Sequence, residues 1–234
     1  MRALIIQHDH ISPPGPVGER FVDLGYDLTL HEVVPEDFFH TPGVPSALPD
    51  LTDFDVVVPM GAPWSAYDHH LIGSWLLPEI EALRMADSAG LPIFGICFGG
   101  QLLATTHGGE VVRSPRPELG WVDVLSDDDS LVPGGPWFQW HYDRWRLPPE
   151  ATEVARNAAA SQAFVLRRNL AVQFHPELTS PMLVGWIENG GAAELERADV
   201  NADMLVADTQ ARDEKSRRRA HRLVDAFLTR VAVG

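Results

Sequence analysis

The only cysteine of this 234-residue chain lies where a nucleophile could be held. Cys97 stands in "GICFGG" (95–100), between an apolar run and a helical pattern. This segment has the form G-x-C-x-G, in which a tight strand-to-helix turn exposes the nucleophile above a sheet. The start of a helix favours the thiolate, and the N–H of Phe98 can point at a developing oxyanion. A buried structural cysteine is the alternative, because a thiol also packs as a small hydrophobe.

A cysteine nucleophile needs a base and a group that orients the base. The segment "LAVQFHPEL" (170–178) offers both, as an apolar strand that ends in His175-Pro176-Glu177. Residues i and i+2 of an extended segment face the same way, and Pro176 favours extended geometry at His175. We therefore expect Glu177 to hold the imidazole while its other nitrogen faces Cys97. Without the cysteine turn, these residues are typical of a surface turn.

Other residue types in the chain suggest a metal site or ligand stacking. Ten histidines include the clusters "HDH" (8–10) and "DHH" (68–70). Neither cluster has cysteine partners or the helical spacing of zinc ligands, so we expect no metal and no cofactor. Tryptophan is mostly a packing residue. The tryptophans expected nearest the site are Trp121, Trp137, Trp140 and Trp145.

The elements that must position these residues alternate between strands and helices in the first half of the chain. Strands are predicted at 2–8, 27–33, 54–60 and 92–96, helices at 15–25 and 77–89, and a loop at 35–50. Such alternation is typical of parallel βαβ units, and parallel strands buried on both faces are continuously apolar, as these are. The pattern predicts an α/β fold with a mostly parallel central sheet flanked by helices.

Shorter strand-like pieces separated by turns follow between about 110 and 175. They are "EVVR", "WVDVL", "WFQWH", "TEVARN", "QAFVLR" and "LAVQFH". An apolar stripe near the end of the chain predicts a closing helix at about 213–231. No linker or repeat divides the sequence, so we expect one domain over residues 1–234.

The overall charge limits the partners that the chain can have. The formal net charge is −15, which argues against nucleic acid and anionic membranes. The basic run 217–219 is expected to be the solvated face of the last helix. A single cysteine forms no internal disulfide, and we find neither a signal peptide nor an apolar run of membrane-spanning length. We expect a cytoplasmic protein.

Five segments together carry a resemblance to a known family. The chain resembles a class I (triad-type) glutamine amidotransferase domain, of the kind found in GMP synthetase and in stand-alone relatives. The segments are "PMGAPWSAYD" (59–68), "GICFGGQLLA" (95–104), "ELGW" (118–121), "WHYDRWRLP" (140–148) and "VQFHPE" (172–177). They run in the order of the family, and the match extends over residues 1 to about 190.

The resemblance implies a flavodoxin-like α/β fold and assigns roles to residues. The implied triad is Cys97, His175 and Glu177; the implied oxyanion donors are the N–H of Phe98 and a backbone N–H in Gly61-Ala62; the implied glutamine pocket includes Gln101, His141 and Tyr142. Ala62 stands where the family often has a second glycine, and Tyr142 replaces the glycine of W-H-G-D. The Tyr142 side chain either alters the pocket wall or points to solvent.

The implied reaction is hydrolysis of the γ-amide of glutamine, through a cysteine thioester, to glutamate and ammonia. The sequence contains no GxxxxGK[ST] loop that could bind ATP and use the ammonia. Three alternatives therefore stay open. The chain is a glutaminase subunit that supplies a separate synthetase, a stand-alone hydrolase of other γ-glutamyl peptides or amides, or a non-catalytic binding protein on the same fold. An intact Cys-His-Glu set disfavours the third.

Overall fold

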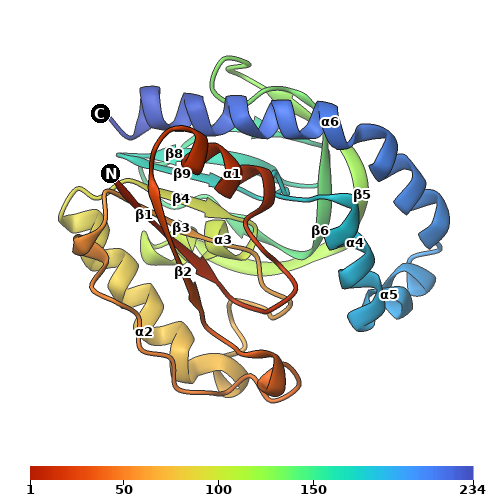
Figure 1. The fold of residues 1–234 in the computed structure, drawn as a ribbon, viewed down its shortest axis with the longest axis horizontal. Coiled ribbons are helices and arrows are strands. Elements are labelled where there is room, and N and C mark those ends of the chain that lie inside the picture. Colours follow the sequence, from red (N-terminus) through yellow and green to blue (C-terminus); the bar gives the residue numbers. More distant parts are fainter. Residues whose placement is uncertain (234) are drawn as a thin grey trace.

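The fold centres on one nine-stranded sheet with helices on both faces (Figure 1). The computed structural model describes residues 1–233. Five parallel strands lie in the order β2 (Asp27–Glu32), β1 (Arg2–Gln7), β3 (Val56–Pro59), β4 (Ile93–Ile96) and β9 (Asn169–Val172). The predicted α/β fold with a parallel core is confirmed.

Four antiparallel strands extend the sheet beyond β9. They are β8 (Ser161–Leu166), β7 (Thr152–Arg156), β5 (Glu110–Ser126) and β6 (Gly135–Arg146), in that order. The prediction of separate strands at "EVVR" and "WVDVL" is wrong, because both belong to β5. The pairing of β5 with β6 is irregular between Arg113 and Glu118, where Pro115 and Pro117 lack the N–H that a regular ladder needs.

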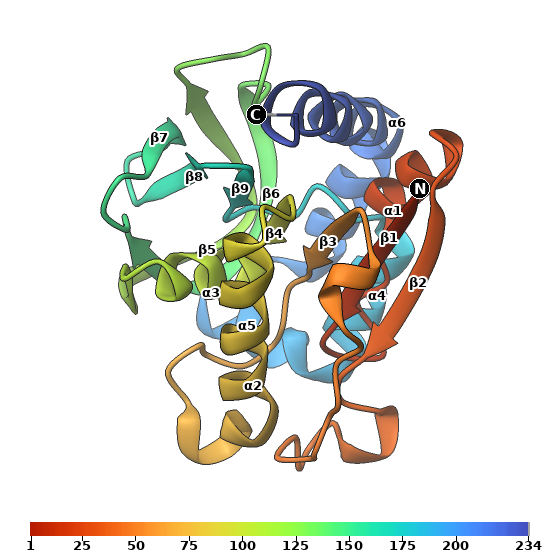
Figure 2. The ribbon, with the colours of Figure 1, turned by 90° about the vertical axis from the view of Figure 1, so that its left-hand side faces the viewer.

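Two helices cover each face of the parallel strands, as the side view shows (Figure 2). Helices α1 (Gly15–Asp23) and α6 (Ala202–Ala226) pack on one face, and α2 (His69–Ser88) and α3 (Phe98–Thr106) on the other. Alternate residues of β1 enter the two cores: Ile5 packs with α1 and α6, whereas Leu4 packs with α2 and α3. The continuously apolar strands are therefore buried on both sides.

A third apolar cluster joins the end of the chain to β6. Helices α4 (Ser180–Trp186) and α5 (Ala192–Arg197) contribute Leu183 and Leu195, which pack with Phe138. A wide turn at Ile187–Gly191 links these helices, and Gly190 takes a φ of 113° there. No helix or strand was predicted for this region from the sequence.

Two predicted helices begin earlier than expected. Helix α2 starts at residue 69 rather than 77 and contains Pro78, which cannot donate a helical hydrogen bond and obscures the pattern. Helix α6 starts at residue 202 rather than 213, and a wide turn at Phe227–Val231 continues it. Its first turns contain Leu205 and Val206, which pack in the third apolar cluster, and the side chain of Asn201 caps the N–H of Met204 at 2.9 Å.

The remaining regular segments are short 3₁₀ turns at Glu36–Phe38 and Leu51–Asp53. Within residues 1–233, no helix combines the length and the apolar character that crossing a membrane requires.

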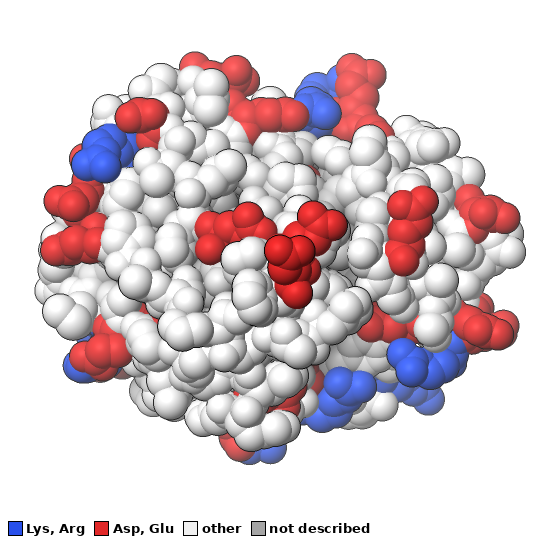
Figure 3. Space-filling view, turned by 60° about the horizontal axis from the view of Figure 1, so that its bottom comes forward, with Lys and Arg blue, Asp and Glu red and all other residues white. Residues whose placement is uncertain are grey.

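On the face drawn in Figure 3, acidic side chains lie across the centre and basic ones stay near the rim. That face presents no continuous basic area of the kind that nucleic-acid binding uses.

Candidate active site

Cys97 occupies the turn between β4 and α3 in a left-handed backbone conformation, with φ 49° and ψ −106°. Such a conformation costs a residue with a side chain about 1–3 kcal/mol, and it is typical of functional turns. The turn packs closely because of its glycines: a Cβ at Gly99 would lie 2.0 Å from the carbonyl oxygen of Pro59. The Cys97 side chain lines a cavity that opens to solvent, although the residue is only 5% exposed.

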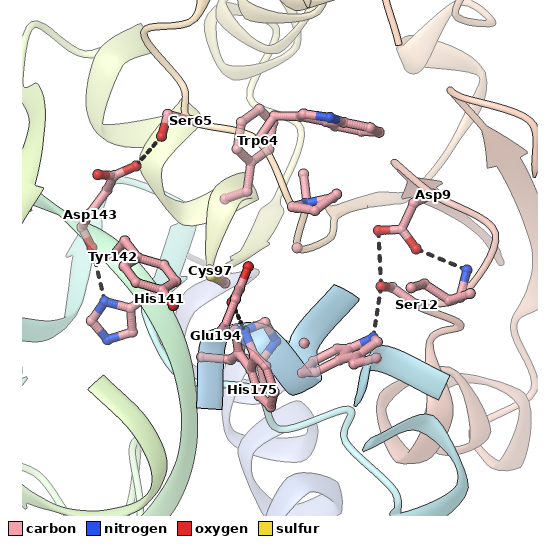
Figure 4. Close-up of a pocket in the computed structure, with 18 of the residues that line it drawn as sticks. Asp9, Ser12, Trp64, Ser65, Cys97, His141, Tyr142, Asp143, His175 and Glu194 are labelled. Carbon is pink, nitrogen blue, oxygen red and sulfur yellow. Dashed lines mark hydrogen bonds between the residues drawn. The ribbon is translucent and has the colours of Figure 1, made fainter. Parts of the chain in front are cut away.

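The predicted base and its orienting carboxylate meet as expected. His175 follows the end of β9, and its Nδ1 lies 2.7 Å from Oε1 of Glu177. Both side chains are buried, and His175 shares the wall of the cavity with Cys97 (Figure 4). Within residues 1–233, Nε2 of His175 has no hydrogen-bond partner. That nitrogen is therefore free to exchange a proton with the thiol or with a substrate.

The electrostatics around His175 favour its charged form. Burial alone lowers the pKa of the imidazole, but the charges of Glu177 and Cys97 and the hydrogen bond to Glu177 raise it well above its usual value. A thiolate beside an imidazolium is the reactive form of a cysteine nucleophile.

Gln173 is a contact of the thiol that the sequence analysis missed. Its Nε2 donates to Sγ of Cys97 at 3.5 Å, and its Oε1 accepts from Nε2 of Gln101 at 3.3 Å. Gln101, which the family resemblance placed in the glutamine pocket, lines the same cavity. The amide donor adds a further favourable contact for a thiolate. Gln173 lies two residues before His175, so the motif itself contained the signal.

The predicted oxyanion donors lie at the base of the cavity. Gly61, Ala62 and Phe98 all line it. A Cβ at Gly61 would lie 3.1 Å from Cε1 of His175 and 3.9 Å from Cβ of Cys97, so this backbone runs directly against both side chains. The N–H of Ala62 donates to no backbone carbonyl within residues 1–233. It remains available to a ligand.

Three of the quoted motifs meet beneath the pocket wall. His141 directs Nδ1 at the carbonyl oxygen of Asp143, 2.9 Å away, and Nε2 at Oε2 of Glu118, 3.3 Å away. The carboxylate of Asp143 accepts hydrogen bonds from Ser65 at 2.5 Å and from Tyr67 at 2.8 Å. These contacts join the segments 59–68, 118–121 and 140–148 and fix the backbone that supports Tyr142.

The side chain of Tyr142 lines the cavity, which answers the question left open by the sequence. The guanidinium of Arg113 lies 4.6 Å from the centre of its ring. Burial, the charge of Glu194 and a hydrogen bond to it raise the pKa of the Tyr142 hydroxyl. Trp140 donates to the same Glu194 carboxylate at 2.8 Å. One cationic and one anionic side chain therefore flank the tyrosine.

Part of the cavity wall comes from segments without a recognisable motif. These residues include Ser12, Phe39, Trp186 and Glu194, whereas Asp9 belongs to the "HDH" cluster and Trp64 to the quoted segment 59–68. Two of them are linked, because Trp186 donates to the Ser12 hydroxyl at 3.1 Å, and that hydroxyl donates to Asp9 at 3.0 Å. They lie in loops or in the α4–α5 region, where neither spacing nor composition indicated a site.

The tryptophans singled out in the sequence are mostly structural. Only Trp140 of the four lines the cavity, so the expectation is wrong for the others. Trp137 and Trp145 are buried in the two main cores, and Trp121 packs against Phe138 and donates to Thr209.

The histidine clusters do not assemble into a metal centre. Among residues 1–233, no group of three or more His, Cys, Asp or Glu side chains is placed to hold a metal ion. His8 is buried against Glu79, whereas His69 and His70 are exposed at the start of α2.

Comparisons with known proteins agree with this arrangement. The sequence model of the family described as glutamine amidotransferase class-I matches residues 41–183. A glutamine-hydrolyzing GMP synthase of Aeropyrum pernix is 38% identical over 113 residues, which cover 44% of this chain but 22% of that protein. One subunit of the glutamine-hydrolyzing GMP synthase of Sulfurisphaera tokodaii is 33% identical over 142 residues, covering 55% of this chain and 70% of that protein.

Solved structures resemble almost the whole chain. A glutamine amidotransferase from Methylobacillus flagellatus has a TM-score of 0.83 and 26% identity, over 97% of this chain and 94% of that one. A glutamine amidotransferase from Thermotoga maritima has a TM-score of 0.82 and 24% identity, over 98% of each chain. The similarity therefore includes the α4–α6 region, beyond the part that the family model matches.

Proposed function

Because the chain belongs to the class-I glutamine amidotransferase family, we propose that it hydrolyses the γ-amide of glutamine to glutamate and ammonia. The single observation that carries this proposal is that Cys97 and His175 line one cavity while buried Glu177 holds the other nitrogen of His175. Cys97 sits in a strained turn, and His175 keeps one nitrogen free. A binding protein without catalysis would require neither feature.

The proposed first half-reaction forms a thioester. The Cys97 thiolate attacks the carboxamide carbon of glutamine, and the negative charge that develops on the oxygen is stabilised by the N–H groups of Phe98 and Ala62. His175, charged at this stage, donates the proton on Nε2 to the nitrogen as the C–N bond breaks. Ammonia leaves, and the glutamyl group remains bonded to Sγ.

The second half-reaction returns the enzyme to its starting state. Neutral His175 takes a proton from water while the oxygen attacks the thioester carbon. The tetrahedral species collapses, the C–S bond breaks, and glutamate is released. Cys97 is again a thiolate and His175 an imidazolium. Throughout the cycle, Glu177 holds Nδ1 and stabilises the positive charge of the ring.

The charged groups beside Tyr142 support recognition of an amino acid. We propose that Arg113 attracts the α-carboxylate of the substrate and that Glu194 attracts its α-ammonium group. Gln101 then supplies a polar contact nearer the thiol. Glu194 lies outside residues 41–183, the segment that the family model matches, but it lines the same cavity as Cys97.

The names of the relatives bear on where the ammonia goes. The Sulfurisphaera protein is named as one subunit of a GMP synthase, whereas the Aeropyrum protein is a synthase of which this chain matches 22%. We propose that this chain, too, supplies ammonia to a separate synthetase subunit. Copurification of a nucleotide-binding synthetase that increases glutamine turnover supports this partner.

A stand-alone γ-glutamyl hydrolase is the second candidate, and the extent of the cavity favours it. The wall continues from Cys97 to Phe39, Trp64 and Trp186, beyond the residues assigned to glutamine. This space could hold a leaving group larger than ammonia. A panel of γ-glutamyl amides and dipeptides separates the two candidates, because only the second predicts a higher kcat/KM for a larger amide than for glutamine in the isolated chain.

The reaction itself is tested by measuring glutamate and ammonia together. We expect the wild-type chain to release them in equal amounts from L-glutamine or a γ-glutamyl amide, and Cys97→Ser to release neither. The variant should unfold within about 1–2 kcal/mol of the wild type, the usual scale of a conservative change. Turnover retained by Cys97→Ser would exclude the proposed nucleophile.

A further inference from the structure

A buried histidine–glutamate pair lies behind the loop that carries Gly61 and Ala62. His8 directly follows β1 and is fully buried, and Glu79 of α2 is 1% exposed. Nε2 of His8 lies 3.1 Å from both carboxylate oxygens of Glu79, and Nδ1 lies 3.1 Å from the carbonyl oxygen of Gly61. Both ring nitrogens therefore face oxygen atoms, and a positively charged imidazole ring can donate a hydrogen bond to each of them.

The surroundings of His8 favour the charged form of its ring. Burial lowers the pKa of the imidazole, but the charge and hydrogen bond of Glu79, with the Gly61 carbonyl, raise it overall. A buried ion pair is seldom needed for stability, because well-packed apolar residues of similar volume often serve as well or better. The position of this pair therefore suggests a role other than stability.

Peptide geometry connects His8 to the proposed oxyanion donor. The carbonyl of Gly61 and the N–H of Ala62 belong to the same planar peptide group, and no peptide bond within residues 1–233 is cis. In a trans peptide these two groups point in opposite directions. His8 holds the carbonyl on the side away from the cavity, and the N–H of Ala62 is thereby directed toward the cavity that both residues line.

The same side chain also packs against the ring of Phe98, the residue that carries the other proposed donor. The His8 ring packs edge-on against Phe98, with ring centroids 4.9 Å apart and an interplanar angle of 71°. The N–H of Phe98 is the donor that follows the nucleophile. His8 is therefore placed to fix the two oxyanion segments relative to each other.

We propose that the His8–Glu79 pair is a positioning device for the oxyanion hole. It orients the 61–62 peptide and, by donating a charged hydrogen bond to its carbonyl, makes the Ala62 N–H a stronger donor. The proposal rests on the hydrolase activity proposed above. It gives His8, a residue of the "HDH" cluster for which no metal site was found among residues 1–233, a role in positioning the oxyanion donors.

Two variants separate orientation from stability. His8→Phe keeps a ring against Phe98 but removes the donor to Gly61. Because this change leaves Glu79 buried without a partner, the double variant His8→Phe/Glu79→Met replaces the whole pair by apolar groups and should fold as well as the wild type. His31→Phe is the matched control, since His31 lies on the neighbouring strand β2 and, within residues 1–233, its side chain bonds only Ser46.

Three readouts are measured on each folded variant: kcat and KM for glutamate release, and the rate at which iodoacetamide alkylates Cys97. Alkylation develops no oxyanion. In the double variant we expect kcat to fall about 30- to 300-fold, comparable to the loss of one oxyanion donor, with KM and the alkylation rate within about threefold. His31→Phe should keep kcat within about twofold.

A double variant that folds and keeps kcat within threefold of the wild type overturns the inference. A fall in the alkylation rate as large as the fall in kcat also overturns it, because that result indicates a disturbed nucleophile. Absence of turnover in the wild type is a failure of the proposed function instead. In that case ¹⁵N NMR of the imidazole decides: two protonated ring nitrogens on His8 at pH 7 support the inference, and a single protonated nitrogen overturns it.

Discussion

Replacement of Gly61 by alanine tests whether the position of His175 limits the reaction. The backbone of Gly61 lies outside the left-handed region, so alanine can adopt its conformation, and the effect comes from the added methyl group alone. That methyl group would lie 3.1 Å from Cε1 and 3.6 Å from Nδ1 of His175, and 3.9 Å from Cβ of Cys97. The first distance is shorter than the roughly 3.5–4.0 Å of a favourable carbon contact.

The imidazole must therefore shift by a few tenths of an ångström, while its 2.7 Å hydrogen bond to Glu177 restrains it. A misplacement of about 1 Å costs on the order of 100-fold in rate, so a shift of this size predicts a fall in kcat of about 5- to 30-fold. Overpacking costs about 1–3 kcal/mol, and removal of a flexible glycine returns about 0.5–1. The net loss of stability should be about 0–2.5 kcal/mol.

The assay follows glutamate release from saturating substrate, alongside urea unfolding. Gly73→Ala is the matched control, because its added methyl group would meet only Cβ of His69 at 3.9 Å, within α2. That control should gain about 0.5–1 kcal/mol of stability and keep its kcat. A folded Gly61→Ala variant with kcat within twofold of the wild type would refute the claim that this backbone sets the position of the imidazole.

Three further predictions concern the base and the pocket wall. His175→Ala should abolish turnover, and Glu177→Ala should retain more of it, because an orienting group contributes less than the base that it orients; the reverse order of kcat values contradicts the assigned roles. The pKa of His175 is raised in the folded state, so protonation of this residue favours folding. This contribution to the free energy of unfolding is complete below about pH 6.5 and is lost as the pH rises through the folded-state pKa. Glu177→Gln should therefore show a shallower fall of Tm with pH above 6.5, and parallel Tm curves would exclude this linkage. Wild-type KM for glutamine should be high in isolation, and Tyr142→Gly should lower it if the side chain is the obstacle; a sub-millimolar wild-type KM with brisk turnover rules this out.

The parts of the site that follow from local geometry could be predicted from the sequence. A glycine-flanked cysteine between an apolar strand and a helix implied the turn at Cys97, and the two-residue spacing implied that His175 and Glu177 face one way. The distance of 2.7 Å between their side chains agrees with that expectation. Both inferences needed only a few consecutive residues.

The rest of the pocket depends on contacts between distant segments. Glu194 reaches the cavity because α4 and α5 fold back over β6, and a single wide turn with Gly190 makes that possible. His8 appeared as a possible metal ligand, since its partner Glu79 lies 71 residues away and no local pattern pairs them. The start of α6 was missed because Leu205 and Val206 pack in the third apolar cluster, whereas the apolar stripe found near the end of the chain, with Leu223 and Val224, belongs to the first.

The most direct test of the account is the chemical state of Cys97 during turnover. The wild-type chain is mixed with L-glutamine or a γ-glutamyl amide that it hydrolyses, quenched in acid within milliseconds to seconds, and digested for mass spectrometry. We expect a glutamyl adduct on the peptide that contains Cys97, formed and lost at rates consistent with kcat and absent from Cys97→Ser. Steady release of glutamate with no adduct on that peptide at any time, or equal release by Cys97→Ser, would contradict the proposed thioester mechanism.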